Sequence, residues 1–489
     1  MKSIVKLFSF ILLFFICNDY ITYASHLSNT DKDEGYKLIV KIRNLNDSIL
    51  ILGHYFGEYQ YVDDTARRSK DGSYVFQGKS PLPGGVYFIV LQNKKHFEFI
   101  INKEQRFTIE SDTIDMLKHM KFKTSVENTH FYEYLNYISQ FNKDMESYKE
   151  GLNKAKDKKD EDSINYYKEK IKVIDEKVKN YKFEFINKYP NDLMSKIFLA
   201  SKDIDLPEAP LLEDGKRDST YLYYYYKEHY FDNIDFSDDR LLRSPVFHSK
   251  LKYFLDYIAN KNPDSLIVDV DKIVDKSRVN KEMFKYVVWY ITYYYETSKI
   301  MGYDAIFVHM VEKYYMTGEA YWVNPQVREN ITKRAMTLKP LLIGKIVPNL
   351  IMEDSIGRLY SLYNIKAKYI ILYFWDLDCG HCKTQTPILG KFYENFKSKG
   401  VEVYAVHVNN AKEKEWKKYI KDNNLNFINV WDPQNKTQFR SIFDVSQTPV
   451  LFVLDSQFKI VGKKLSTEQL EDFINRRFEF DEKEKNKNN

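Results

Sequence analysis

Two cysteines, Cys379 and Cys382, are the residues of this 489-residue chain best suited to chemistry. They enclose the dipeptide Gly380-His381, and the one other cysteine of the sequence is Cys17. A disulfide between residues this close in sequence closes too small a loop to stabilise a fold much through chain entropy. We therefore interpret Cys379 and Cys382 as a redox pair that forms a reversible disulfide, rather than as a structural cross-link.

The local sequence assigns a different role to each sulfur. The apolar run IILYFW at residues 370–375 predicts a buried strand, and a helix is expected to begin at Cys379. Free backbone N–H groups and the helix dipole favour a thiolate at a helix N-terminus. We therefore expect Cys379 to attack a substrate disulfide. Cys382, one turn into the helix, is expected to be shielded and to resolve the mixed disulfide.

A zinc half-site is the main alternative for two cysteines at this spacing. Such a site needs two further ligands, and the sequence contains no second closely spaced cysteine pair. His381 lies between the two sulfurs and cannot complete a tetrahedral set alone. We therefore predict neither a metal nor an organic cofactor.

The surrounding elements predict an α/β layer fold, because apolar strand signals alternate with helical periodicity over residues 343–480. The segment YFWDLDCGHCKTQTP, which contains the cysteines, resembles the thioredoxin superfamily, and the domain resembles its TlpA-like branch. Thr448-Pro449 precedes the strand VLFVLD, as the cis-proline of that superfamily does. The resemblance implies a thioredoxin fold in which Thr448 offers its backbone to a substrate strand and Pro449 packs beside the sulfurs.

Two residues depart from the pattern of that family. Many relatives carry a glutamate three residues after the second cysteine, thought to handle the proton of the buried thiol, where this chain has Gln385. Thioredoxin itself buries an aspartate six residues before the first cysteine, where this chain has Tyr373. Residues three apart on a helix share a face, so we expect Gln385 to hydrogen-bond the sulfur of Cys382 without accepting its proton. Proton transfer is then left to water, His381 or a carboxylate such as Asp376 or Asp378.

The dipeptide Gly380-His381 bears on the direction of electron flow. An imidazole beside the pair stabilises the thiolate, which raises the reduction potential from about −270 mV, as in thioredoxin, toward about −180 mV, as in isomerases. The TlpA-like scaffold implies instead a reductase supplied by a membrane-bound thiol donor. We expect reduction of disulfide-containing envelope proteins, with isomerase or oxidant activity as the alternative. A peroxidase is disfavoured because Asp376 stands where peroxiredoxins of this fold place a threonine.

The first residues predict export to the periplasm or cell envelope. Lys2 and Lys6 precede the apolar run LFSFILLFFIC, which is short for a bilayer span. We expect a signal peptide at residues 1–24, cleaved after Ala24, with lipidation of Cys17 as the alternative. Basic and acidic residues, 74 and 69 in number, are interleaved along the chain, which argues against a nucleic-acid partner.

The chain is therefore expected to be multidomain. Short aromatic and β-branched runs separated by turn residues predict an antiparallel β domain over residues 35–115. Helical periodicity predicts an all-α domain over residues 116–338, in which the tyrosine-rich segment 221–231 is expected to be core, with sugar binding as the alternative. Both regions resemble the uncharacterised domains fused to TlpA-like domains in Bacteroidetes-type secreted proteins. The alternative function is therefore an envelope binding module, in which the β and helical domains hold a ligand and the cysteine pair acts as a redox sensor. The charged residues 481–489 predict a disordered tail.

Overall fold

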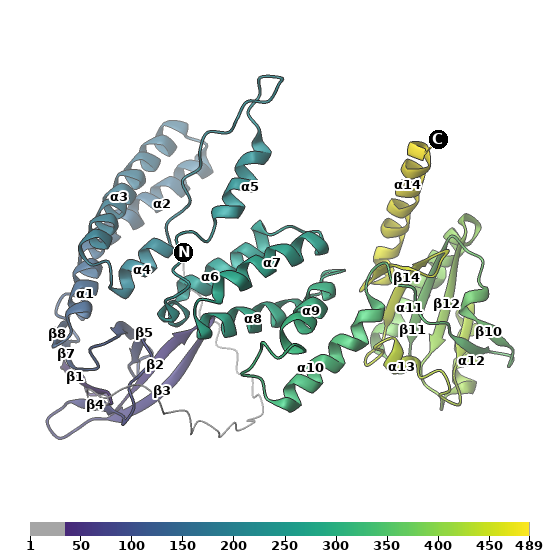
Figure 1. Cartoon of the computed structure of the whole chain (residues 1–489), viewed down its shortest axis with the longest axis horizontal. Coiled ribbons are helices and arrows are strands. Elements are labelled where there is room, and N and C mark those ends of the chain that lie inside the picture. The colour runs from purple at the N-terminus through teal and green to yellow at the C-terminus, as the bar shows by residue number, and fades with distance from the viewer. Residues whose placement is uncertain (1–34, 489) are drawn as a thin grey trace.

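The computed structural model describes residues 35–488, which form two bodies joined by helix α10 (Pro325–Leu338) (Figure 1). The larger body combines a β-rich and a helical region, and the smaller body is the C-terminal α/β domain. The predicted signal peptide, residues 1–24, and Cys17 lie outside the described residues. Among the residues that are described, no helix has the length and apolar character needed to cross a bilayer.

The β-rich region contains two four-stranded sheets, in the orders β4-β1-β7-β8 and β3-β2-β5-β6. The first of these sheets is mixed, because β1 runs parallel to β7, so the expectation of a purely antiparallel domain is wrong there. The chain builds the second sheet between β1 and β7, which allows it to re-enter the first sheet in the original direction. The strands are β1 (Lys37–Arg43), β2 (Ile49–Phe56), β3 (Tyr59–Arg67), β4 (Tyr74–Gln77), β5 (Gly85–Val90), β6 (His96–Ile101), β7 (Arg106–Asp112) and β8 (Lys121–Lys123).

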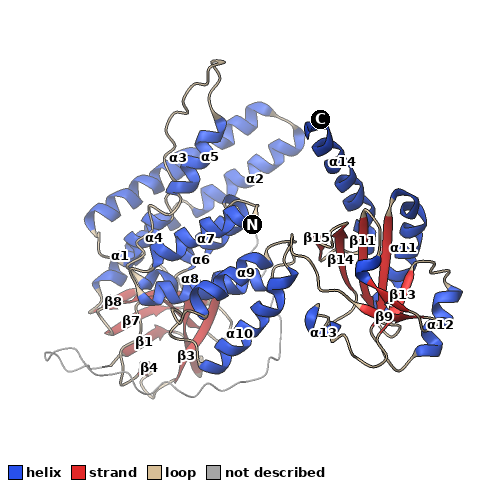
Figure 2. Ribbon diagram, turned by 45° about the vertical axis from the view of Figure 1, so that its right-hand side comes forward, coloured by secondary structure: helices blue, strands red, loops and turns tan. Residues whose placement is uncertain are grey.

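The helical region packs directly on the second sheet and shares its core (Figure 2). Strand residues such as Phe99 and helix residues such as Phe247 and Tyr286 belong to one continuous apolar cluster. The two regions expected as separate domains are therefore held together by hydrophobic burial. The helices are α1 (Val126–Ser139), α2 (Asn142–Lys158), α3 (Glu161–Lys188), α4 (Leu193–Ala200), α5 (Ser219–His229), α6 (Pro245–Tyr253), α7 (Pro263–Ser277), α8 (Lys281–Glu296), α9 (Asp304–Met310) and α10.

The tyrosine-rich helix α5 departs from expectation, because none of its residues is buried. Tyr221, Tyr223 and Tyr224 are 38, 41 and 61% exposed, so the prediction that they form core is wrong. Their neighbours Tyr230 and Phe231, which follow the helix, are buried. Aromatic residues occupy every side of α5, and a helix at the surface of a body can bury only one side.

The C-terminal domain is built on a seven-stranded mixed sheet in the order β10-β9-β13-β12-β11-β14-β15, which confirms the α/β prediction. The interior strand β11, which lies between β12 and β14, is buried along its whole length. Tyr373 and Trp375 face one core cluster, which includes α11, while Leu372 and Phe374 face the other. The elements are β9 (Ile351–Asp354), β10 (Leu359–Ser361), β11 (Tyr369–Trp375), α11 (Gly380–Phe396), β12 (Val401–His407), α12 (Glu413–Asp422), β13 (Ile428–Trp431), α13 (Phe439–Ile442), β14 (Val450–Asp455), β15 (Ile460–Lys463) and α14 (Leu470–Asn488).

Helix α14 continues to Asn488, so the prediction of disorder at residues 481–489 is wrong for 481–488. Asp481 is held at the start of β11, where the Tyr369 hydroxyl donates a hydrogen bond to its carboxylate at 2.7 Å and Lys368 forms an ion pair with it at 3.0 Å. Asp481, one of the charged residues that suggested disorder, therefore attaches the last helix to the sheet.

The two bodies meet at a buried ion pair between Lys463 of β15 and Asp304 of α9. Their side chains are only 5 and 4% exposed. The ammonium group of Lys464 donates a hydrogen bond to the carbonyl of Ser298 at 2.8 Å beside this pair. A buried charge that loses its partner is strongly destabilising, so this pair constrains how the two bodies sit.

We expect Asp304→Ala to destabilise the contact between the two bodies by about 3–5 kcal/mol, because the buried ammonium of Lys463 would lose its carboxylate partner. Thermal unfolding of the full chain, with proteolysis of the segment after α10, measures this loss. Arg334→Ala is the matched control, since it removes the more exposed ion pair with Asp444, and pairs of that kind contribute about 0–1 kcal/mol. Equal effects of the two substitutions would contradict the role of the buried pair.

Candidate active site

Cys379 caps the N-terminus of α11, directly after the buried strand β11. Its backbone is extended, and its sulfur accepts a hydrogen bond from the backbone N–H of Cys382 at 3.2 Å. The thiol of Cys379 also lies 3.2 Å from the carbonyl oxygen of Thr448, to which it donates. Cys379 is half-buried, whereas Cys382 is fully buried. Only the first sulfur is therefore open to a substrate.

The environment shifts the two thiols in opposite directions. Burial by itself raises the pKa of Cys379, but hydrogen bonds from the Cys382 thiol and from the backbone N–H groups of His381 and Cys382 outweigh it, so this pKa lies below its ordinary value. Burial, followed by the hydrogen bond with Cys379, raises the pKa of Cys382 to about 12. At neutral pH Cys379 therefore carries the more reactive sulfur, while the buried thiol of Cys382 stays protonated.

The Thr448–Pro449 peptide bond is cis and lies opposite the cysteine pair. Within residues 35–488, the backbone N–H of Thr448 donates no hydrogen bond. This N–H group belongs to the loop just before β14 and is placed within reach of anything attached to Cys379. The roles expected for Thr448 and Pro449 in substrate binding remain predictions that this geometry accommodates.

Among the described residues, Gln385 forms no hydrogen bond with the sulfur of Cys382, contrary to the expectation for this residue. Its side-chain oxygen accepts hydrogen bonds from the backbone N–H and the hydroxyl of Thr467, at 2.8 and 2.6 Å. Its amide nitrogen donates to the carboxylate of Glu468. Gln385 therefore fastens α11 to the start of the last helical segment and is not placed to handle a proton of the buried thiol.

Tyr373 occupies the core beneath the pair without supplying a base. It is fully buried, and its hydroxyl lies 3.2 Å from the hydroxyl of Thr386, which is also buried. Burial raises the pKa of Tyr373, so the phenol stays neutral. Asp378 is also an unsuitable base, because its ion pair with Lys412 at 2.7 Å lowers its pKa.

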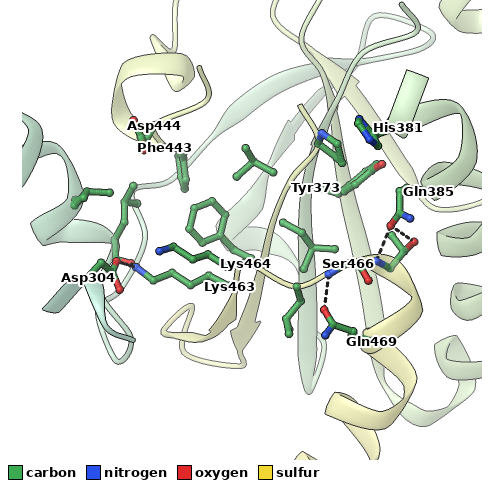
Figure 3. A pocket seen from close by; sticks show the side chains of 18 residues that line it. Asp304, Tyr373, His381, Gln385, Phe443, Asp444, Lys463, Lys464, Ser466 and Gln469 are labelled. Atoms are coloured by element: carbon green, nitrogen blue, oxygen red, sulfur yellow. Dashed lines mark hydrogen bonds and ion pairs between the residues drawn. The ribbon is translucent and has the colours of Figure 1, made fainter. Parts of the chain in front are cut away.

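The dipeptide between the cysteines is exposed. A Cβ added at Gly380 would meet no atom within 4 Å, so no steric reason requires glycine there. The His381 ring forms no hydrogen bond among the described residues and lies at the mouth of a cavity (Figure 3). The tuning of the redox potential by these two residues therefore stays a prediction.

His407 is a buried titratable residue that the sequence analysis did not identify. It ends β12, opposite Trp375, and stacks on Trp416 with the ring centroids 5.7 Å apart. Burial lowers its pKa to about 4, so the imidazole is neutral under physiological conditions. Its only sequence signal is a histidine at the end of an apolar run, which is too weak to locate a site. Among the described residues, no group of three or more His, Cys, Asp or Glu side chains is arranged to hold a metal ion.

A cavity of about 550 Å³ opens beside the pair, at His381 and Pro449 (Figure 3). It extends to Asp304 and Leu338, which belong to the helical region rather than to the C-terminal domain. This side of the cavity could not be predicted from the sequence, because residues of α9 and α10 carry no local signal of proximity to Cys379.

Comparison with known proteins places these observations in a family. Residues 343–463 match the AhpC/TSA family, and residues 190–338 match a domain of unknown function, DUF5106. The thiol-disulfide oxidoreductase ResA of Bacillus subtilis is 31% identical over 135 residues, which are 27% of this chain and 74% of the relative. The corresponding protein of Bacillus cereus is 30% identical over 135 residues, which are 27% of this chain and 76% of that relative.

The chain belongs to the ResA family of thiol-disulfide oxidoreductases. Solved structures that resemble it include the following two. A domain of a possible thiol-disulfide isomerase from Cytophaga hutchinsonii is 40% identical, with a TM-score of 0.28, and covers 29% of this chain and 98% of its own. A thioredoxin-like protein from Bacteroides caccae is 18% identical, with a TM-score of 0.46. The match covers 56% of this chain and 98% of that protein. This ResA-family member is a redox enzyme, and Cys379 and Cys382 are the cysteines among its described residues.

We expect Cys379 to be alkylated well before Cys382 when the reduced chain is titrated with iodoacetamide from pH 6 to pH 9. The thiolate reacts, and its fraction rises as the pH passes the pKa, which lies below the ordinary value for Cys379 and near 12 for Cys382. Peptide mapping by mass spectrometry distinguishes the two sites. Cys379→Ser is the control, and it should remove labelling at neutral pH. Equal labelling of both thiols near pH 8.5 would contradict the assignment.

Gln385→Glu is expected to destabilise the chain at pH 7 and much less at pH 4. The new carboxylate would face Glu468, and repulsion raises its pKa in the folded state above the unfolded value of about 4.3. Folding stability is therefore lost as the pH rises through this range, in which the carboxyl group introduced at position 385 and that of Glu468 both ionise. Thermal unfolding against pH measures it, and Gln385→Ala, which adds no charge, should show a smaller pH dependence, because it loses only the hydrogen bond to the Glu468 carboxylate. A faster resolving step in Gln385→Glu, with unchanged stability, would restore the proton-handling hypothesis.

Proposed function

We propose that this chain reduces disulfides of exported proteins through Cys379 and Cys382. The observation that carries the proposal is the asymmetry of the two sulfurs: one is accessible with a lowered pKa, and the other is buried with a raised pKa. An accessible thiolate can attack a disulfide, while a buried thiol is protected until the mixed disulfide brings a target within reach.

The proposed reaction proceeds in two exchanges. The Cys379 thiolate attacks one sulfur of the substrate disulfide, forming a mixed disulfide, and the other substrate sulfur leaves as a thiolate. Cys382 then loses its proton, which this departing thiolate can take up, and attacks the sulfur of Cys379. The mixed disulfide breaks, a Cys379–Cys382 disulfide forms, and the second substrate sulfur leaves as a thiolate that takes a proton from water. Two electrons pass to the substrate, so a thiol donor must reduce the pair again.

The cell envelope is the proposed compartment, supported by the signal peptide expected at residues 1–24. A membrane-bound thiol donor would then regenerate the pair. Isomerase or oxidant activity is the second candidate, and one observation favours it: the lowered pKa of Cys379 stabilises the reduced form and so raises the reduction potential.

Trapping tests the proposal directly. In Cys382→Ala the first exchange can occur but the second cannot, so mixed disulfides on Cys379 should accumulate in cells and disappear on treatment with dithiothreitol. Cys379→Ser combined with Cys382→Ala is the matched control and should trap nothing. In parallel, the purified full chain should reduce insulin at a rate that Cys379→Ser abolishes. Absence of adducts together with absence of insulin reduction would overturn the proposal.

A further inference from the structure

The cavity beside the cysteine pair has walls from both bodies of the molecule (Figure 3). One end is formed by His381 and Pro449, next to the reactive sulfur, and the other by Asp304 and Lys463. Leu338, at the end of α10, faces β14 and β15 across this space. Its position follows from the buried pair of Asp304 with Lys463 and from the ion pair that Arg334 of α10 forms with Asp444.

The lining is mainly apolar, and its polar residues include the buried pair of Asp304 with Lys463. Its apolar residues come from α10, the turn that follows it, the end of α13, β14 and the loop after β15: Leu338, Leu341, Phe443, Val450, Leu451, Phe452 and Leu465. An apolar side chain that enters this space leaves water and is stabilised by burial. A small hydrophilic thiol would gain nothing from the same walls.

One polar group next to the lining residue Pro449 and one in the wall of the cavity lack a partner among the described residues. The backbone N–H of Thr448, next to the sulfur, has no acceptor. The Oδ1 atom of Asp304, whose side chain is 96% buried, accepts no hydrogen bond, although its other oxygen pairs with Lys463. An extended polypeptide that passes the cysteine pair offers a backbone carbonyl to the N–H of Thr448, whereas the buried Oδ1 atom of Asp304 lies beyond its reach.

We propose that the helical region completes the substrate cleft, which binds an extended polypeptide with an apolar residue beside its reactive cysteine. Leu338 is the specificity-determining residue from the helical side. The segment of the substrate that is attached to Cys379 passes Thr448, and its apolar side chain enters the space between Leu338 and Phe452. The inference rests on the proposed function and names its substrate class. It also gives the helical region a part in substrate selection.

The experiment measures single-turnover oxidation of the fully reduced full chain. The substrates are two synthetic disulfide peptides that differ only in a Leu or Ser beside the cysteine, and hydroxyethyl disulfide, which has no side chain to select. Leu338→Trp fills the cavity from the helical side, and Leu338→Ala removes the contact with less steric change. Ile343→Trp is the matched control, because Ile343 is exposed just after the same turn and does not line the cavity.

We expect the unmodified chain to prefer the Leu peptide over the Ser peptide by about tenfold or more, as apolar pockets do for a matched side chain. Leu338→Trp should slow the Leu peptide by a similar factor and leave hydroxyethyl disulfide within about twofold, while Leu338→Ala lowers the preference. Ile343→Trp should change neither rate. Equal rates for the two peptides, or an unaffected Leu peptide in Leu338→Trp, would overturn the cleft while leaving the redox function intact. If none of the three disulfides oxidises the unmodified chain, both the proposed cleft and the proposed redox function are overturned.

Discussion

Burial of strand β11 on both faces is the constraint on which the active site depends. Tyr373 and Trp375 pack into the core beneath α11, and Leu372 and Phe374 pack into the opposite core. The strand has no freedom to slide, because a shift of one residue would exchange the two sets of side chains. The residues that follow must therefore leave the sheet at one fixed point, and that point places Cys379 at the N-terminus of α11.

The chemistry of the pair follows from this placement rather than from the cysteines alone. Backbone N–H groups at the start of α11 face the first sulfur and lower its pKa, while one turn of helix carries the second sulfur into the core and raises its pKa. The described surroundings offer few bases: Tyr373 is a neutral phenol, Asp378 is paired with Lys412, and His407 is kept neutral by burial. Proton movement is thus left to the exchanging thiols, the exposed His381, the half-buried Asp376 and water.

The joint between the two bodies gives the helical region a structural connection to this chemistry. A buried ion pair is costly to form unless both charges are well paired, and here it joins β15, a strand next to β14, to α9. The same contact brings α10 to the edge of the cavity that begins at His381. The extra domains of this ResA-family member are therefore in direct contact with the space that a substrate would enter.

The sequence by itself determined the features that are encoded locally. The apolar run before Cys379 predicted β11 and the start of α11, the spacing of the pair predicted one exposed and one buried sulfur, and Thr448-Pro449 marked the loop before β14. Only the tertiary structure decided the parallel pairing of β1 with β7, the exposure of α5, the partners of Gln385 and the wall formed by Leu338. The physical reason is the separation along the chain: Gln385 and Thr467 are 82 residues apart, and Asp304 and Lys463 are 159 apart. Periodicity and capping are properties of neighbouring residues, whereas such contacts form only when distant segments pack together.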